Sequence, residues 1–341
     1  MNKFKFYFIL LIATVSLFSC SKDETVTYEP PREYSVQYEA DIKVIEEYLN
    51  TYYITVTNNP GKTDDQDVIM TKIPDGGTQP SIMSYLNSGT YPKLLSRNAS
   101  MNGTTYKLYY LVLREGTGSS LCNVDGVLTS YRGDYLESIA ATTTTALSIS
   151  TTKFDEVKYP QTFFPLFTTQ AIPLRGWSEI LPQFKAGTYA SNSDGTITYN
   201  DFGAGVMFLP SGFGYYDTGS GSIPSYAPLV FSFKLYEIQR LDQDGDGIPS
   251  YQEDLDGDGY MYDFSNLIKY PTPPTTNPDD SDKDGIPDFF DVDDDGDMYT
   301  TKLEITNAAT GLVYPFASIP DCSGNFTDPA RIKKHLDKNC H

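Results

Sequence analysis

Apolar and polar positions along the chain predict a helix followed by a series of strands. In residues 38–50, YEADIKVIEEYLN, Ile42, Ile45 and Leu49 recur at the spacing of one helical face. This helix packs on its own domain or serves as a dimerisation arm, and we favour the first interpretation. From Tyr106 onwards the chain changes to runs rich in strand-forming residues, KLYYLVLREG, GVLTSYRG, GAGVMFLP and LVFSFKLYEI, with a helical pattern only in GWSEILPQF. These elements predict an α+β fold in which an antiparallel sheet wraps on one short helix.

Turn-forming residues interrupt this pattern in two places. Asn58-Asn59-Pro60-Gly61 and Gly76-Gly77 indicate that turns and loops dominate residues 57–104. Asn192-Ser193-Asp194-Gly195 is typical of a hairpin tip, inserted within the strand-rich part of the chain.

The N-terminus has the pattern of a secretory signal. Two lysines precede an apolar run, residues 6–18, which is shorter than the roughly 20 residues of a membrane-spanning helix. The run ends in Leu-Phe-Ser before Cys20, which indicates a lipoprotein cleavage box. We therefore expect a signal peptide over 1–19 and an outer-membrane lipoprotein anchored through Cys20, with an ordinary anchor helix as the alternative. Residues 21–24, SKDE, resemble the tag of some Bacteroidetes surface lipoproteins, and both periplasmic and cell-surface locations stay open.

The charge of the chain argues against one class of partner. Asp and Glu number 45 against 25 Lys and Arg, a formal charge of −20, so we expect no nucleic-acid partner, which would need a basic face. Both histidines, His335 and His341, lie in the tail, which argues against a histidine-based catalytic or zinc site. In an oxidising compartment Cys322 and Cys340 are close enough in sequence to form a disulfide, and Cys122 would then be an unpaired, buried thiol.

Much of the acid lies in a repeated loop pattern. Asp242, Asp244, Asp246, Gly247 and Glu253 occupy positions 1, 3, 5, 6 and 12 of a calcium loop. Ca²⁺ takes about six to eight oxygen ligands, and the glycine allows the sharp turn that gathers them around one ion. The pattern recurs, in whole or in part, at Asp254, Asp256 and Asp258 with Ser265 in the closing position, at Asp280, Asp282, Asp284 and Asp291, and at Asp293, Asp295, Asp297 and Glu304. We expect these carboxylates to bind structural Ca²⁺.

Two features set these loops apart from EF-hands. Pro249 and Pro287 stand inside the loops, where they exclude the long flanking helices of that motif. In the last loop Met298 replaces the glycine. DQDGDGIPS and DSDKDGIPD instead resemble thrombospondin type 3 repeats, which implies a calcium-clad region with little hydrophobic core over 241–304. A solvated acidic linker is the alternative.

Six motifs between residues 104 and 240 resemble, in order, those of FKBP-type peptidyl-prolyl cis-trans isomerases. They are VLREGTG, VLTSYRG, KFDEVKYPQTFF, LRGWSEILPQFKAG, FLPSGFGYY and SIPSYAPLVFSFKLYEI. The resemblance implies an aromatic-walled pocket that needs no cofactor for catalysis. Its lining, carried onto this sequence, is Tyr131, Phe154, Asp155, Phe164, Pro173, Leu174, Trp177, Tyr215, Ile223 and Phe231. Trp177 would form the floor, and Tyr215 would donate a hydrogen bond to a bound carbonyl. Asp155 would pair with Tyr131.

The chain departs from this family in three places. The segment before Phe154, ESIAATTTTALSISTT, is longer than the family's loop, and a second insertion carries the hairpin tip at 192–195. The family's glycine after Tyr215 is replaced by Tyr216, and Phe213 competes with Tyr215 for the same role. All three departures affect access to the implied pocket and leave the fold expectation unchanged.

The sequence predicts five parts: a signal peptide over 1–19, a lipid-anchored tether with a helical and loop region over 20–103, an FKBP-type isomerase domain over 104–240, calcium-binding repeats over 241–304, and a tail over 305–341. The predicted function is isomerisation of X–Pro bonds in exported or cell-surface client polypeptides, with chaperone activity as an added role. The alternative is a calcium-stiffened surface binding lipoprotein whose isomerase-like domain is catalytically weak.

Overall fold

The computed structural model describes residues 30–139, 147–168 and 175–340, and Glu33–His341 forms one compact unit. Cys20, Pro173 and Leu174 lie outside the described residues, so the lipid anchor at Cys20 stays a prediction. Among the helices that the structure describes, none combines the length and the apolar character needed to span a bilayer.

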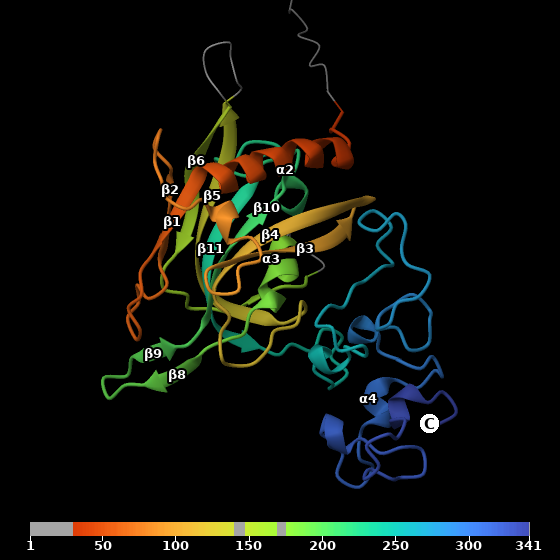
Figure 1. Cartoon of the computed structure of the whole chain (residues 1–341). Coiled ribbons are helices and arrows are strands. Elements are labelled where there is room, and N and C mark those ends of the chain that lie inside the picture. The colour runs from red at the N-terminus through yellow and green to blue at the C-terminus, as the bar shows by residue number, and fades with distance from the viewer. Residues whose placement is uncertain (1–29, 140–146, 169–174, 341) are drawn as a thin grey trace, which may run out of the picture. The chain divides into compact units, whose positions relative to one another are not determined.

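The main sheet is antiparallel, with strands in the order β3-β4-β10-β11-β5-β6 and β7 paired to the start of β5 (Figure 1). The helices are α2 (Tyr34–Thr51), α3 (Arg175–Ile180) and α4 (Thr301–Glu304). The strands are β1 (Tyr52–Val56), β2 (Val68–Lys72), β3 (Lys93–Met101), β4 (Thr104–Arg114), β5 (Gly126–Ile139), β6 (Ser148–Val157), β7 (Phe164–Pro165), β8 (Thr188–Ser191), β9 (Ile197–Asn200), β10 (Gly203–Leu209) and β11 (Leu229–Gln239). The predicted α+β architecture, built on an antiparallel sheet, is confirmed.

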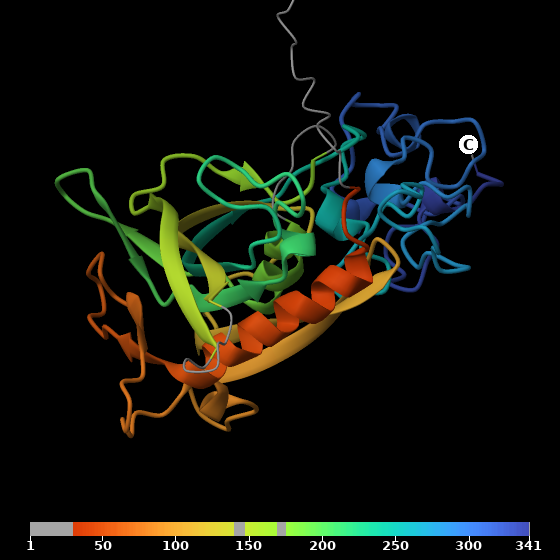
Figure 2. The same ribbon diagram turned by 90° about the horizontal axis from the view of Figure 1, so that it is seen from above.

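Both faces of this sheet are buried, each against a different helix (Figures 1 and 2). Along β4, Leu108 and Tyr110 belong to the apolar cluster that contains α3. The alternating residues Tyr109 and Leu111 belong to the cluster that contains α2. Strands β4 and β10 are therefore continuous apolar runs, as expected of strands covered on both sides. The sequence pattern placed one short helix on the sheet, and the structure adds α2 on the opposite face.

The helix predicted at 38–50 is confirmed as α2, and it packs on its own domain. Ile45 and Leu49 are buried against the sheet. The buried carboxylate of Asp41 accepts hydrogen bonds from the backbone amide and the hydroxyl of Ser211, at 2.7 and 2.6 Å. Hydrogen bonds to a charged group are stronger than those between neutral groups, so this contact fastens α2 to the turn after β10.

Two segments expected to be loops contain strands. Within 57–104, β2 pairs with β1, and β3 joins the main sheet through β4. The sheet therefore extends across residue 103, where the sequence suggested a domain boundary. The described ends of the segment ESIAATTTTALSISTT, residues 137–139 and 148–152, extend β5 and β6 and pair with each other. Polar residues fill the exposed positions of these strands, so no apolar run marks them in the sequence. The hairpin predicted with its tip at 192–195 is confirmed as β8–β9.

The chain beyond β11 has little regular structure and little core. Its apolar side chains form two small clusters, one around Phe289 and one around Ile248. The expected disulfide between Cys322 and Cys340 is present, and Cys122 is a buried free thiol. A region with so little apolar burial needs another source of stability, such as a disulfide or bound metal ions.

We expect Asp41→Ala to lower the free energy of unfolding by about 2–3 kcal/mol, because the buried amide and hydroxyl of Ser211 lose their charged acceptor. Urea unfolding of residues 33–341, followed by circular dichroism, measures the change. Glu39→Ala, at an exposed position of the same helix, is the control and should be close to neutral. Equal midpoints for the two variants would mean that α2 is a detachable arm.

Candidate active site and acidic loops

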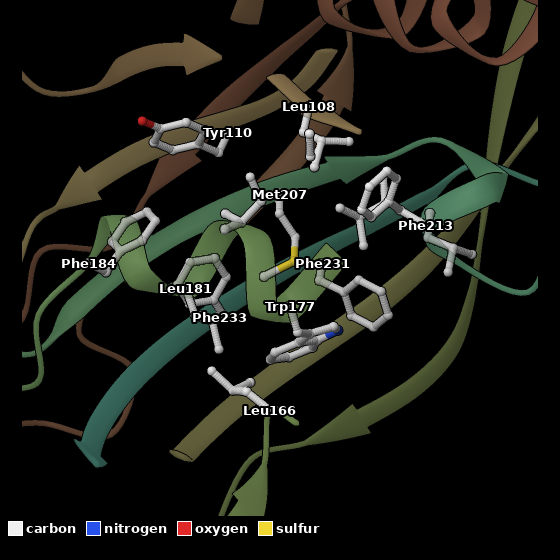
Figure 3. Packing of buried hydrophobic residues seen from close by; sticks show 14 of the residues in the cluster. Leu108, Tyr110, Leu166, Trp177, Leu181, Phe184, Met207, Phe213, Phe231 and Phe233 are labelled. Atoms are coloured by element: carbon white, nitrogen blue, oxygen red, sulfur yellow. The ribbon is translucent and has the colours of Figure 1, made fainter. Parts of the chain in front are cut away.

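Helix α3 brings Trp177, the only tryptophan in the sequence, against the sheet (Figure 3). The preceding residue, Gly176, lies so close to β10 that a Cβ would collide with the side chain of Leu209. Glycine at this position lets the helix approach the sheet closely, and the indole is buried with 5% of its surface exposed. The Gly-Trp pair of the predicted helix therefore has a packing reason.

Three aromatic rings surround the indole of Trp177. The ring centroids of Tyr131, Phe164 and Phe231 lie 5.2, 5.5 and 5.0 Å from it, all in edge-on arrangements. Such pairs contribute about 0.5–1.5 kcal/mol each beyond the burial of their area. Phe154 packs in turn against Phe231, at 5.5 Å. Residues from β5, β6, β7, β11 and α3, all assigned to the pocket from sequence, thus meet in one cluster.

One polar pair borders this cluster. The hydroxyl of Tyr131 donates to Oδ2 of Asp155 at 2.6 Å, the pairing that the family resemblance implied. Burial, followed by this hydrogen bond and the charge of Asp155, raises the pKa of Tyr131 above its usual value, so the phenol keeps its proton. Asp155 itself is exposed. The pair therefore forms a polar rim beside an apolar site.

Tyr215 and Phe213 were the two candidates for the residue that donates a hydrogen bond to a bound carbonyl, and of the two only Tyr215 has a hydroxyl group. It is half-buried against the same cluster as Trp177, and burial raises its pKa, so its hydroxyl stays protonated. The nearby charge of Asp155 raises that pKa further. The competing residue, Phe213, is fully buried and packs edge-on to Tyr106 at 4.9 Å, so it belongs to the core.

Tyr216 occupies a backbone position that favours glycine. Its φ is 45°, in the left-handed region that favours glycine. Its ring stacks on that of Tyr34, the first residue of α2, with centroids 4.1 Å apart. Helix α2 therefore supports the loop that carries Tyr215. Ile223, also assigned to the pocket from sequence, is buried in the same cluster as Trp177.

A separate cleft of about 420 Å³ lies between the segment 57–69 and strands β5, β6 and β11. Lys234 lines it, and its ammonium forms an ion pair with Asp67 at 2.5 Å. Of the residues predicted for the aromatic pocket, Tyr131 alone borders this cleft. The cleft is therefore distinct from the predicted pocket.

The four acidic loops share one backbone turn. In each, the first aspartate accepts a hydrogen bond from the amide at position 6, at 3.1, 2.8, 3.1 and 3.0 Å along the chain. The aspartates at positions 1, 3 and 5 of each loop offer oxygens within 4.8 Å of one another, namely Asp242, Asp244 and Asp246, Asp254, Asp256 and Asp258, Asp280, Asp282 and Asp284, and Asp293, Asp295 and Asp297. In the described residues the predicted closing carboxylates Asp291 and Glu304 are not members of these groups.

Met298 keeps this turn without the glycine. Its φ is 79°, close to the 83° of Gly259 and of the same sign as the 108° of Gly247. A side chain in the left-handed region costs roughly 1–2 kcal/mol. The last loop therefore holds its acidic groups together against a backbone strain, and the third loop has a comparable one at Lys283, whose φ is 68°.

Two carboxylates beneath the loops are buried without hydrogen-bond donors. Glu253, the predicted closing ligand of the first loop, is 3% exposed, and neither of its oxygens has a partner. Burial, followed by the charges of Asp244 and Asp246, raises its pKa to about 12. Asp294 is equally buried and bare, and burial followed by neighbouring carboxylates raises its pKa to about 10. Bare oxygens of this kind are the ligands that a hard cation prefers.

Sequence reasoning missed three buried aspartates, Asp279, Asp288 and Asp294. Asp279 accepts a hydrogen bond from the amide of Leu255 at 2.9 Å, which ties two loops together. Asp288 accepts from the amide and hydroxyl of Ser281 at 2.8 and 2.7 Å. Asp279 and Asp294 fall outside the positions where the loop pattern seeks ligands, whereas Asp288 stands at position 9 of the third loop, which supplies a ligand in calcium loops, often through water. The density of acid in PDDSDKD and DVDDDGD, greater than one loop requires, was the signal that could have found Asp279 and Asp294.

The second acidic loop is fastened to α3 by two of its tyrosines. The hydroxyl of Tyr260 donates to the carbonyl of Glu179 at 2.9 Å, and that of Tyr262 donates to its carboxylate at 3.0 Å. Arg97 of β3 lies 3.3 Å from the same carboxylate and stacks over the ring of Tyr260 at 3.4 Å. We call these four residues the tyrosine brace. Because Glu179 lies on the same short helix as Trp177, the brace connects the acidic region to the candidate site.

Comparisons with known proteins give a match in this acidic region. The family model described as BamM C-terminal matches residues 243–329, which include the acidic loops and run beyond the predicted boundary at 304. A comparison with curated proteins gave no match.

Several solved structures are similar over part of the chain. A peptidyl-prolyl cis-trans isomerase from Pseudomonas syringae pv. tomato is 18% identical, covers 45% of this chain and 86% of its own, and has a TM-score of 0.27. FkpA from Escherichia coli is 23% identical, covers 39% of this chain and 48% of its own, and has a TM-score of 0.27. The N-terminal domain of FKBP42 from Arabidopsis thaliana is 15% identical, covers 39% and 86%, and has a TM-score of 0.27.

We expect Arg97→Ala to lower the free energy of unfolding by about 3 kcal/mol, because it leaves the buried carboxylate of Glu179 without its cation. Urea unfolding of residues 33–341 measures the loss. Lys158→Ala removes an exposed ion pair to Glu156 and should change stability by less than about 1 kcal/mol. A loss no larger than that of the control would mean that the brace contributes nothing to the fold.

Proposed function

We propose that the aromatic cluster is a peptidyl-prolyl cis-trans isomerase site. The observation that carries this proposal is the ring of aromatic side chains around Trp177, bordered by the hydrogen-bonded pair of Tyr131 and Asp155. The FKBP-like order of motifs along the sequence supports the same assignment. The substrates would be X–Pro bonds of client polypeptides, and no catalytic cofactor is needed.

The chemistry asked of such a site suits these residues. Rotation about an X–Pro bond is opposed by amide resonance, with a barrier of about 18–20 kcal/mol. No nucleophile or proton transfer is required, because an apolar surrounding disfavours the polar planar amide more than the twisted one. Tyr215, which keeps its proton, would donate to the carbonyl of the bound peptide. Asp155 would hold Tyr131 in its orientation against Trp177.

The cellular setting in this proposal follows from the N-terminal pattern. The apolar run before Cys20 supports an outer-membrane lipoprotein, exposed to the periplasm or the cell surface. Exported or surface proteins would then be the clients. Binding of their unfolded segments would also give a chaperone activity.

A binding module is the second candidate, and one observation favours it. Trp177 and Phe231 are 5% and 2% exposed, so these rings offer little open surface to a prolyl side chain. Tyr216 places a bulky ring where the family has glycine, next to the donor loop. In this reading the site holds a proline-containing segment without accelerating its isomerisation.

We also propose that Ca²⁺ orders the acidic loops in a structural role. Buried carboxylate oxygens without donors, such as those of Glu253, support this role. Without a cation, two such charges 4 Å apart repel by about 4 kcal/mol at an effective dielectric of 20. With Ca²⁺ they become ligands, and the binding free energy contributes to folding.

We expect Trp177→Leu to reduce the acceleration of X–Pro isomerisation about tenfold, because the pocket floor loses its three aromatic contacts. A protease-coupled assay with an X–Pro peptide and residues 33–341 measures the rate. Phe184→Leu is the matched control, since Phe184 is equally buried but packs against Tyr110 and Phe233. Wild-type protein that folds and shows no acceleration would sink the isomerase proposal and favour the binding module.

We expect removal of Ca²⁺ with a chelator to open residues 242–304 to proteases while the sheet stays resistant. The sheet has its own core on both faces, whereas the acidic loops depend on neutralised charge. Limited proteolysis with and without chelator, with the cut sites mapped by mass spectrometry, tests this. Identical fragment patterns in both conditions would indicate a solvated acidic linker, the alternative interpretation of the sequence.

A further inference from the structure

Asp246, Glu253 and Asp294 form a buried carboxylate triad where the first acidic loop meets the last. One oxygen from each lies within 4.8 Å of the others. The three residues are 3%, 3% and 2% exposed. Asp294 stands at position 2 of its own loop, outside the pattern of ligand positions, so the loop motif alone does not account for its burial.

Five of the six carboxylate oxygens of this triad have no hydrogen-bond donor, and the sixth, Oδ1 of Asp246, accepts from the backbone amide of Ile248 at 2.6 Å. Oδ2 of Asp246 and both carboxylate oxygens of Glu253 and Asp294 are buried without a hydrogen-bond partner. The hydroxyl of Thr301 accepts a hydrogen bond from the backbone amide of Asp294 at 3.1 Å. It makes no well-formed hydrogen bond to the carboxylate of Asp294. None of the ion pairs within the described ranges includes a triad residue. The nearby Lys302 donates to a backbone carbonyl at 2.9 Å.

A bound cation satisfies this arrangement. A bare buried carboxylate costs several kcal/mol, and three together add their mutual repulsion. If these three side chains were protonated, they would form O–H···O hydrogen bonds with one another. The oxygens of Asp246, Glu253 and Asp294 that have no partner form no such bond. Two ligand oxygens on opposite sides of a Ca²⁺, each about 2.4 Å away, are about 4.8 Å apart. The spread of the triad fits within one coordination sphere.

We infer that Asp246, Glu253 and Asp294 bind one Ca²⁺ that links the first loop to the last, an inference that rests on the proposed Ca²⁺ role. The donor-free oxygens of the triad supply most of the about six to eight ligands that Ca²⁺ takes, and water supplies the rest. The site shares Asp246 with the group formed by Asp242 and Asp244 at the entrance of the loop. Asp246 therefore bridges an exposed and a buried position.

The link has a consequence for the rest of the molecule. It fixes both ends of the chain between Glu253 and Asp294, a stretch that contains Tyr260 and Tyr262 of the tyrosine brace. Closing a stretch of chain lowers the entropy that it gains on local opening. The ion therefore holds the braced segment against α3.

Asp294→Asn tests the inference, because the amide has nearly the same shape but lacks the charge. Equilibrium dialysis of residues 33–341, with the metal measured by mass spectrometry, gives the number of Ca²⁺ bound and their affinities. We expect Asp294→Asn to bind one Ca²⁺ fewer, or one ion at least about tenfold more weakly. Asp328→Asn, at an exposed position outside the loops, should bind as wild type does.

Thermal unfolding in the presence of chelator separates Ca²⁺ binding by Asp294 from a merely structural role of its side chain. There, Asp294→Asn should melt at the wild-type temperature or above, because the ion that Asp294 would bind is absent, and should gain less than wild type when Ca²⁺ is added. Glu253→Gln should behave in the same way. If Asp294→Asn matches wild type in bound Ca²⁺ and in the gain of melting temperature, this inference fails and the Ca²⁺ role stands. If wild-type protein binds no Ca²⁺, both fail.

Discussion

The close approach of α3 to the sheet is the contact on which the rest of the structure depends. Gly176 allows it, because any larger residue would meet Leu209. Trp177 then packs among rings from β5, β7 and β11, which fixes the position of those strands relative to the helix. The floor of the candidate site is thus also the centre of the core. For this reason rates of site variants have meaning only beside a control of equal burial.

The acidic region of the chain differs from the sheet in what it buries. Its apolar clusters are small, and the carboxylates of Glu253 and Asp294 are buried without hydrogen-bond partners. In the proposed Ca²⁺ role, order there would depend on the ion supply, whereas order in the sheet depends on apolar burial. Extracellular calcium modules bind their ion with dissociation constants of about 10⁻⁴–10⁻³ M, which would suit the proposed location outside the cytoplasm.

The sequence predicted most of what local pattern can encode. The four long apolar strands, the helix at 38–50 and the hairpin at 192–195 are present, because periodicity and turn residues determine them locally. β3 and the extension of β5 and β6 were not predicted, because their exposed positions are polar and only pairing with neighbours makes them strands. The second layer over the sheet was missed for a related reason, since an amphipathic helix does not reveal in sequence what it covers.

The residues of the candidate sites also divide into those that a sequence pattern can identify and those that only tertiary contacts reveal. The order of the FKBP-like motifs along the sequence identified Trp177 and its aromatic neighbours, which lie together in the structure. Asp294 could not be found in this way, because its partners come from another loop and its position is a spacer in the repeat. The tyrosine brace was likewise invisible, since Tyr260 and Glu179 look like unrelated residues until folding joins them.

The two halves of the molecule are coupled through this brace, and the direction of the coupling follows from their stabilities. The sheet has an apolar core on each face, and the residues of these cores come from outside the acidic region. The acidic region has little core, so its tyrosines reach Glu179 only when the loops are ordered. Helix α3 is short and makes few hydrogen bonds of its own, and Glu179 places the brace within one turn of Trp177. Ordering of the loops therefore adds constraint to the helix that forms the floor of the site, while the site adds little to the loops. A cation bound in the acidic region would act on the aromatic site by stiffening α3, without contacting it.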